Sequence, residues 1–294
     1  MVPLVTPFTA DGGLDEPALE RLVDAQIEGG ISGIFVLGTT GEGAHVPREF
    51  RRRLVELAVR RAAGRTHIFA GLGDVQLTDL SEANGFFDAG AEAVVAHPPI
   101  REKVAPDQLR NWFQSMLAGL KGPLLLYNMP LTTGVSIPLD AVEMLLGHPR
   151  LAGIKDSENH PQRHAELLQR FGGKENFSVF IGVGALMESG LKQGADGIVP
   201  SVGNLIPDVC HKLCEAAKKS DWSLAGKLTA RMNAVASLYQ KGRNLNESLA
   251  ALKAAMHCRN LCGSLVLPPL RKVSLAELEK IRSHMHELHL LNGK

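Results

Sequence analysis

Short apolar runs alternate with amphipathic segments along most of the chain. The runs are rich in aliphatic and β-branched residues and are apolar throughout, which is typical of parallel strands that are covered on both faces. We expect strands at residues 2–8, 33–37, 67–72, 93–97, 123–127, 151–155, 178–181 and 197–200.

The segments between these runs have the 3.6-residue period of amphipathic helices. Several begin with a proline near the first turn, and several end at glycine, as at Gly90 and Gly194. We expect helices at residues 16–28, 47–62, 78–89, 106–118, 138–146, 162–170, 184–192 and 207–218.

Eight strand–helix repeats favour an α/β fold of the closed (β/α)8 barrel type, the TIM barrel. The competing architecture is a doubly wound open sheet, but residues 9–13 lack the Gly-x-Gly-x-x-Gly turn that would favour it. After about Lys219 the strand pattern stops, and helices are expected at residues 223–241, 246–258 and 275–291. We therefore predict a catalytic barrel over residues 1–219 and a C-terminal three-helix region over residues 220–294.

Composition narrows the class of partner. The 294 residues are 45% hydrophobic and carry a formal net charge of +1, so no overall field attracts nucleic acid or an anionic membrane. No apolar stretch approaches the roughly 18 residues of a membrane span, and no signal-peptide pattern is found at the start. We expect a small-molecule partner, no nucleic acid, no membrane and a cytoplasmic location.

The four cysteines form two i,i+4 pairs, Cys210 with Cys214 and Cys258 with Cys262. This spacing places two thiols on one helix face, but zinc sites usually arise from tighter Cys-x2-Cys turns. We expect free thiols packed between C-terminal helices and no metal centre.

The apolar run at residues 151–154 ends in Lys155-Asp156-Ser157. Lysine is rarely buried for packing, because its ammonium must lose its water, and burial favours the neutral amine. A neutral amine attacks carbonyl carbon. The alternative is a lysine paired with Asp156 at a strand end, and this motif alone does not decide between the two.

Two other motifs fall at the carboxyl ends of predicted strands, where barrels of this type carry their active sites. Gly38-Thr39-Thr40-Gly41 is suited to holding a carboxylate, because glycines let the backbone approach while hydroxyl and N–H groups donate. Its alternative is a glycine turn whose threonines bond their own backbone. Tyr127 is either a proton relay or a packed tyrosine with a hydrogen-bonded tip.

These parts fit one mechanism. Lys155 would attack a 2-oxo group, the threonine loop would hold the neighbouring carboxylate, and Tyr127 with a threonine hydroxyl would move protons during Schiff-base formation. The iminium is the electron sink, so the adjacent carbon can lose a proton to give an enamine. The enamine adds to an aldehyde or is released by aldol cleavage, and no cofactor is required.

At four motifs the chain resembles the pyruvate-dependent class I aldolases and dehydratases typified by dihydrodipicolinate synthase and N-acetylneuraminate lyase. The motifs lie at residues 3–8, 38–42, 127–134 and 153–157. The resemblance covers nearly the whole chain. It implies a (β/α)8 barrel with a C-terminal helical region, commonly assembled as a homotetramer or dimer of dimers.

The resemblance also implies roles for individual residues. Lys155 corresponds to the Schiff-base lysine, Tyr127 to the proton-transfer tyrosine, Thr40 to the carboxylate binder and Thr39 to a relay hydroxyl. Val199 corresponds to the position whose backbone carbonyl faces the bound pyruvate. The glycines beside the threonines, Gly38 and Gly41, belong to the same binding loop.

Two departures from the family pattern concern the second substrate. Members that make the lysine precursor carry an arginine where this chain has Thr132, and a neutral hydroxyl suits a polyol tail better than a second carboxylate. Those members also have an aromatic pair after the fourth strand, where residues 97–101 read His-Pro-Pro-Ile-Arg. Arg101 either approaches an acceptor carboxylate from another angle or is a solvated loop residue.

We therefore predict a Schiff-base lyase that acts on a 2-keto-3-deoxy sugar acid or a related 4-hydroxy-2-oxo acid. The alternatives are dihydrodipicolinate synthase activity, which condenses pyruvate with aspartate semialdehyde, and N-acetylneuraminate lyase activity. A catalytically silent 2-oxo acid binding protein and a metal-dependent barrel lyase are the hypotheses of other classes. Cleavage and dehydration share the same imine, so the sequence does not separate an aldolase from a dehydratase.

Overall fold

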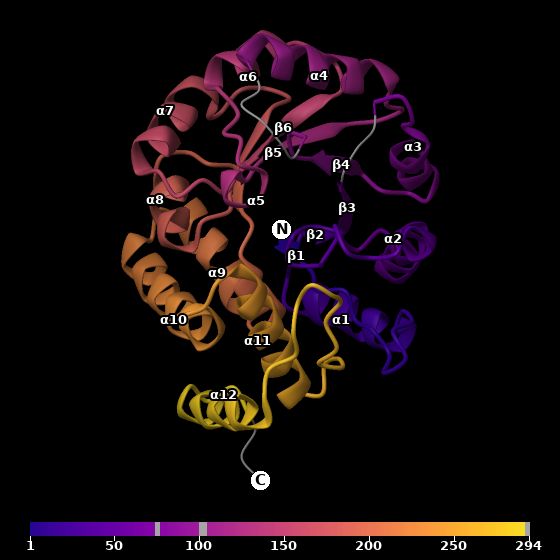
Figure 1. Ribbon diagram of the computed structural model, residues 1–294. Helices are drawn as coiled ribbons and strands as arrows, with labels where there is room; N and C mark the ends of the chain where they lie inside the picture. The colour runs from indigo at the N-terminus through magenta and orange to yellow at the C-terminus, as the bar shows by residue number, and fades with distance from the viewer. Residues whose placement is uncertain (74–76, 100–104, 292–294) are drawn as a thin grey trace.

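The computed structural model describes residues 1–73, 77–99 and 105–291. In these ranges eight parallel strands form one sheet in which each strand pairs with the next along the chain (Figure 1). The first and last strands also meet, because the Met1 nitrogen donates to the Ile198 carbonyl at 2.9 Å. The strands are β1 Val2–Pro3, β2 Gly33–Val36, β3 His67–Leu72, β4 Ala93–Ala96, β5 Leu124–Asn128, β6 Leu151–Asp156, β7 Ser178–Ile181 and β8 Gly197–Ile198.

Helices surround this ring of strands and confirm the (β/α)8 barrel (Figure 1). Local sequence explains where they begin: at α1, the Asp15 side chain accepts from the Ala18 N–H, and Pro17 occupies the first turn. The barrel helices are α1 Glu16–Glu28, α2 Arg48–Ala62, α3 Ser81–Asp88, α4 Pro106–Gly119, α5 Pro130–Thr133, α6 Leu139–Leu145, α7 Pro161–Phe171, α8 Met187–Lys192 and α9 Pro207–Lys218.

The side chains of each strand separate into two apolar layers. Ile34 and Val36 of β2 pack in the large core between strands and helices, whereas Phe35 packs inside the barrel. Tyr127 and Val199 share that inner cluster with Phe35. Alternation along the strands therefore decides which residues reach the barrel interior.

The first strand is shorter than predicted. β1 ends at Pro3, and Phe8 instead forms an antiparallel bridge with Leu14. The Leu4 N–H still donates to the Phe35 carbonyl at 2.9 Å, but the Val5 N–H donates to the Asn204 side chain at 3.1 Å, so the ladder ends before the rest of the run at residues 2–8.

The C-terminal part consists of α10 Trp222–Gln240, α11 Leu245–Cys258 and α12 Leu275–Glu287. α10 packs against α9, and α11 and α12 pack in turn against α10. The four cysteines are free, as predicted. No helix within the described ranges is long and apolar enough to cross a membrane.

Candidate active site

Lys155 lies inside the barrel near the carboxyl end of β6. Its neighbour Ile154 packs outward in the helix-side core, so alternation directs Lys155 inward. Its side chain is only 5% exposed, and its Nζ lies 3.9 Å from the centroid of the Tyr127 ring and 4.9 Å from that of the Phe35 ring. Ring faces attract an ammonium group and exclude water from it.

The alternative partner of this lysine, Asp156, faces the other way. The Asp156 carboxylate accepts from Arg163 Nε at 2.8 Å and from Asn128 Nδ2 at 3.0 Å. It therefore forms an ion pair with Arg163. Pairing with Asp156 does not explain the burial of Lys155.

Tyr127 connects the lysine to the threonine loop. β5 and β6 pair with Tyr127 opposite Lys155, and the Tyr127 hydroxyl lies 3.2 Å from Thr39 Oγ1. Burial by itself would raise the pKa of the Tyr127 phenol, but the Lys155 charge and hydrogen bonds with Thr39, Lys155 and Ser157 outweigh it. The resulting pKa is lower than the ordinary 10.0, which makes the phenol a better proton donor.

The loop after β2 is closed by its own backbone. The Gly38 carbonyl accepts from the N–H groups of Gly41 and Gly43, each at 3.0 Å, and Thr6 Oγ1 donates to the Gly41 carbonyl at 2.6 Å. These bonds leave Thr39 and Thr40 at the turn, where both are half-buried. The loop is thus a fixed turn with two hydroxyl groups at its tip.

Close backbone approach explains the glycines around this loop. Leu37 has a φ of +58°, and its carbonyl lies against Gly43 and Gly71. A Cβ atom would come within 1.8 Å of that oxygen at Gly43 and within 2.2 Å at Gly71. Only glycine fits at either position.

A cavity of about 210 Å³ opens beside the loop. Gly38, Thr39, Tyr127 and Thr132 line it, and the C-terminal part closes one side with Leu245, Asn246, Leu249 and Leu270. Tyr127 and Phe35 form part of the wall, and Lys155, which does not itself line the cavity, has its Nζ against both of their rings.

The remaining predicted site residues lie near this cavity without lining it. Val199 is buried in the barrel interior beside Tyr127, and its N–H donates to the Ile181 carbonyl at 2.8 Å. Thr40 and Gly41 belong to the same turn as Thr39. Arg101, the other sequence candidate for contact with an acceptor, lies outside the described residues.

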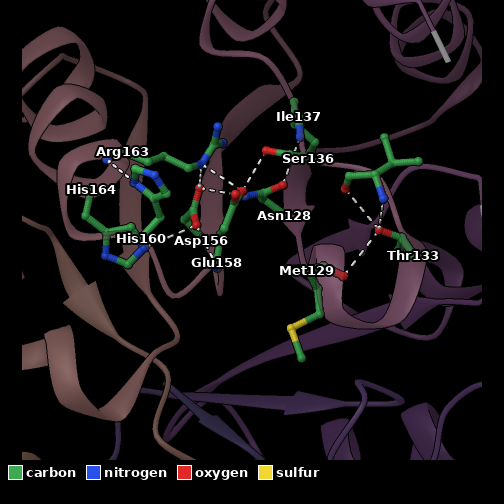
Figure 2. A network of polar contacts seen from close by, with 11 residues as sticks. Asn128, Met129, Thr133, Ser136, Ile137, Asp156, Glu158, His160, Arg163 and His164 are labelled. Atoms are coloured by element: carbon green, nitrogen blue, oxygen red, sulfur yellow. Dashed lines mark hydrogen bonds and ion pairs between the residues drawn. The ribbon is translucent and has the colours of Figure 1, made fainter. Parts of the chain in front are cut away.

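A polar network that the sequence analysis did not identify fixes the ends of β5 and β6 (Figure 2). Asn128 and Asp156 directly follow Tyr127 and Lys155, and they pair in the same register. Asn128 Oδ1 also accepts from the Ile137 N–H at 2.9 Å. The two reactive side chains are therefore held by strand ends that are bonded to each other.

The network stabilises the ionised form of the Asp156 carboxylate. Burial by itself would raise the pKa of Asp156, but the His164 hydrogen bond, the Arg163 charge and the Glu158 N–H lower it below the ordinary 3.8. Asp156 stands in the lysine motif, but its partners on α7 lie seven and eight residues further on. No spacing rule would have linked them to it.

Comparison with known proteins identifies the family. Residues 1–288 match the Dihydrodipicolinate synthetase family. The 4-hydroxy-tetrahydrodipicolinate synthase of Salinibacter ruber is 35% identical over 225 residues, covering 76% of this chain and 74% of that protein.

Solved structures agree with this match. The dihydrodipicolinate synthase of Bacteroides thetaiotaomicron has a TM-score of 0.92 at 29% identity, covering 97% of each chain. The enzyme of Acinetobacter baumannii, solved in complex with pyruvate, has a TM-score of 0.90 at 27% identity, covering 99% of this chain and 98% of that one. The chain therefore belongs to the dihydrodipicolinate synthetase family of pyruvate-dependent lyases.

Proposed function

We propose that this protein is a Schiff-base lyase that forms an imine between Lys155 and the 2-oxo group of pyruvate. The observation that carries the proposal is the position of Lys155, buried between two rings with the Tyr127 hydroxyl bridging to Thr39. The pyruvate complex of the related Acinetobacter baumannii enzyme supports the choice of keto acid.

The chemistry requires proton transfer at each step. The neutral Lys155 amine adds to C2 of pyruvate, and as the nitrogen loses a proton the former carbonyl oxygen gains one, which gives a neutral carbinolamine. Loss of water, after a second proton transfer to that oxygen, gives the iminium. Loss of a proton from C3 then gives the enamine. We assign these transfers to the Tyr127 hydroxyl, with Thr39 as the relay.

The threonine loop would hold the substrate. The pyruvate carboxylate would accept from Thr40 and from backbone N–H groups of the turn between Gly38 and Gly41. The Val199 carbonyl would face the bound keto acid from the opposite wall. Thr132 lines the cavity and would contact the second substrate.

The relatives favour the condensation of pyruvate with aspartate semialdehyde as the complete reaction. The Salinibacter ruber relative and others of 30% to 34% identity are named 4-hydroxy-tetrahydrodipicolinate synthase. This reaction was the alternative in the sequence analysis, and the relatives support it better than the sugar acid reaction.

One observation keeps the cleavage of a 2-keto-3-deoxy sugar acid as the second candidate. Thr132 is neutral, and the described residues that line the cavity include neither arginine nor lysine. A polyol tail matches such a wall better than a carboxylate does.

Reductive trapping tests the imine. Incubation with pyruvate and borohydride is expected to add one carboxyethyl group to Lys155, and Lys155→Met should remove the adduct while the protein stays folded. Peptide mapping locates the adduct, and Lys253 provides an internal comparison because it is also buried. Unlabelled wild-type protein at saturating pyruvate, or an adduct at another lysine, would refute the assignment.

A substrate panel decides between the two complete reactions. Condensation is followed with pyruvate and aspartate semialdehyde, and cleavage by pyruvate release from 2-keto-3-deoxy sugar acids, 4-hydroxy-2-oxoglutarate and N-acetylneuraminate. The substrate with the highest kcat/KM identifies the reaction.

A further inference from the structure

The threonine loop has a second anchor, at the glutamate that follows it. Glu42 has a φ of +56°, and its side chain is only 1% exposed. This conformation is uncommon for a residue other than glycine, asparagine or aspartate, so the surrounding contacts must hold it. Its backbone is held within the loop, where its N–H donates to the Thr39 carbonyl at 3.1 Å, whereas the contacts of its carboxylate come from the C-terminal part of the chain.

Lys253 of α11 is the charge partner of Glu42. Its side chain is 1% exposed, and its Nζ lies 2.5 Å from Glu42 Oε1. The same Nζ donates to the Leu265 carbonyl at 2.7 Å and lies 4.4 Å from the centroid of the Phe8 ring. The Glu42–Lys253 pair is therefore enclosed by protein on every side.

The segment after α11 binds the other carboxylate oxygen. The Leu267 N–H donates to Glu42 Oε2 at 2.7 Å, although the two residues are 225 positions apart. Figure 1 shows this yellow segment rising from α11 toward the strand ends of β1 and β2. Glu42 also lines the cavity, so its contacts link the C-terminal part directly to the cavity wall.

A buried pair of this kind fixes geometry more than it adds stability. Removing one partner leaves an uncompensated charge in the interior, whereas replacing both partners by neutral groups is often tolerated. Burial lowers the pKa of Lys253, and the Glu42 charge and hydrogen bond oppose that change. The ammonium therefore depends on its carboxylate partner.

We propose that Lys253 is a positioning residue, which holds the Gly38–Gly41 turn through Glu42 so that Thr39 and Thr40 can bind the carboxylate of the keto acid. The inference rests on the proposed function, because it assigns that carboxylate to the threonine loop. It adds a role for the C-terminal helices, since α11 supplies the charge that orients a loop of the barrel.

The double variant Glu42→Gln/Lys253→Met separates positioning from stability. Both replacements are close in size to the native side chains, and neither leaves a buried charge. The melting temperature should be closer to the wild-type value than that of Lys253→Met. The KM for pyruvate should nevertheless stay raised by about tenfold, because a small displacement of a binding group is costly, and kcat at saturating pyruvate should change less.

Glu42→Gln alone provides a second readout. Glutamine keeps an acceptor for the Leu267 N–H, and Lys253 can become neutral, so this variant is expected to fold. Its KM for pyruvate should also rise more than its kcat falls. A double variant and a Glu42→Gln variant that both keep the wild-type KM would overturn the proposal and leave the pair a purely stabilising contact.

A matched control uses an ion pair within the C-terminal part. Arg243 Nε donates to Glu277 Oε1 at 2.9 Å, and neither residue lines the cavity. Arg243→Met/Glu277→Gln should leave the KM for pyruvate unchanged. An equal rise in this control would show that any loosening of the helices has the same effect, which contradicts a specific role for Lys253.

Trapping of wild-type protein keeps the two proposals distinct. If wild-type Lys155 is not labelled, the proposed function fails. If it is labelled, and both Glu42→Gln/Lys253→Met and Glu42→Gln keep the wild-type KM for pyruvate, only the present inference fails.

Discussion

Two lysines are buried in the described part of the chain, and their surroundings differ. Lys253 meets a carboxylate and a carbonyl oxygen, which hold its charge and its position. Lys155 meets the faces of Tyr127 and Phe35, and within the described residues no carboxylate pairs with its Nζ. The Lys253 nitrogen is thus held in place by fixed oxygen atoms, whereas the Lys155 nitrogen is not, which matches the positioning role proposed for Lys253 and the nucleophilic role proposed for Lys155.

Tyr127→Phe tests the proton relay at the same scale. Phenylalanine keeps the ring beside Lys155 but removes the hydroxyl that contacts Thr39. We expect kcat to fall by about 100-fold, with little change in the KM for pyruvate, since general acid–base catalysis is worth that much. Single-turnover kinetics with borohydride trapping should show slower imine formation at Lys155.

The second tyrosine provides the control for this variant. Tyr239 is buried, and its hydroxyl bonds Ser201 Oγ at 2.8 Å. Tyr239→Phe should keep kcat close to the wild-type value. A Tyr127→Phe enzyme with wild-type kcat would show that the phenol transfers no proton in the slow step.

At this scale, sequence motifs identified the residues that meet at the barrel mouth. Lys155 and Tyr127 could be found because each ends an apolar strand in a polar residue. The partners Arg163 and Lys253 could not be found, because they come from helices whose faces are set by tertiary packing. Their roles stay predictions until the variants are measured.

At the scale of elements, the backbone of β6 sets the position of Lys155. Gly153 has a φ of +151°, and a Cβ atom there would lie 2.1 Å from the Ser178 carbonyl of β7. The register between β5 and β6 also shifts just before this position. The glycine lets β6 run close to β7 two residues before Lys155.

Gly153→Ala tests this close approach. Alanine would meet both an unfavourable φ and a backbone clash, so we expect the free energy of unfolding to fall by at least about 2 kcal/mol. Gly147→Ala is the matched control, because Gly147 has a φ of +86° but an added Cβ atom would meet no other atom within 4 Å. This control should lose about 1 kcal/mol. Urea unfolding measures both, and equal losses would show that the clash with β7 is unimportant.

Most element positions could be read from the sequence, because hydrophobic period and end signals agree there. α1 begins and ends where Asp15 and Gly29 predict. The prediction of a strand over the whole of residues 2–8 was wrong, because apolar composition does not show which backbone N–H groups have a partner on a neighbouring strand. The helix expected over residues 275–291 ends earlier, at Glu287.

At the scale of the whole molecule, the barrel and the C-terminal helices share a cavity wall. Leu249 and Leu270 close the cavity that Thr39 and Tyr127 line. The sequence predicted a division near residue 219, which stays a prediction, as do the homotetramer and the cytoplasmic location. Contacts such as Glu42 with Leu267 could not be foreseen, since no local pattern relates positions so far apart.

Acid stability of the whole protein should depend on Asp156. Its pKa is lower in the folded state than the ordinary 3.8, so the native state binds fewer protons than the unfolded state as pH falls. Its contribution is therefore complete above about pH 5 and is lost as pH falls through the folded-state pKa. Asp156→Asn should cost about 3 kcal/mol at neutral pH and show a smaller further loss on acidification.

Urea unfolding at a series of pH values measures this difference. Asp88→Asn, which removes an exposed pair with Lys121, should change the free energy of unfolding by less than about 1 kcal/mol. Parallel stability curves for wild type and Asp156→Asn below pH 4 would contradict the assignment of acid sensitivity to this carboxylate.

The contact between Glu42 and Leu267 has a consequence for protein synthesis. A ribosome adding roughly 5 to 20 residues per second needs on the order of ten to forty-five seconds to pass from one residue to the other. For most of that interval the nascent barrel carries a glutamate whose partners Lys253 and Leu267 have not yet been translated. Polypeptides released early by a premature stop codon would lack those partners and leave this carboxylate hydrated.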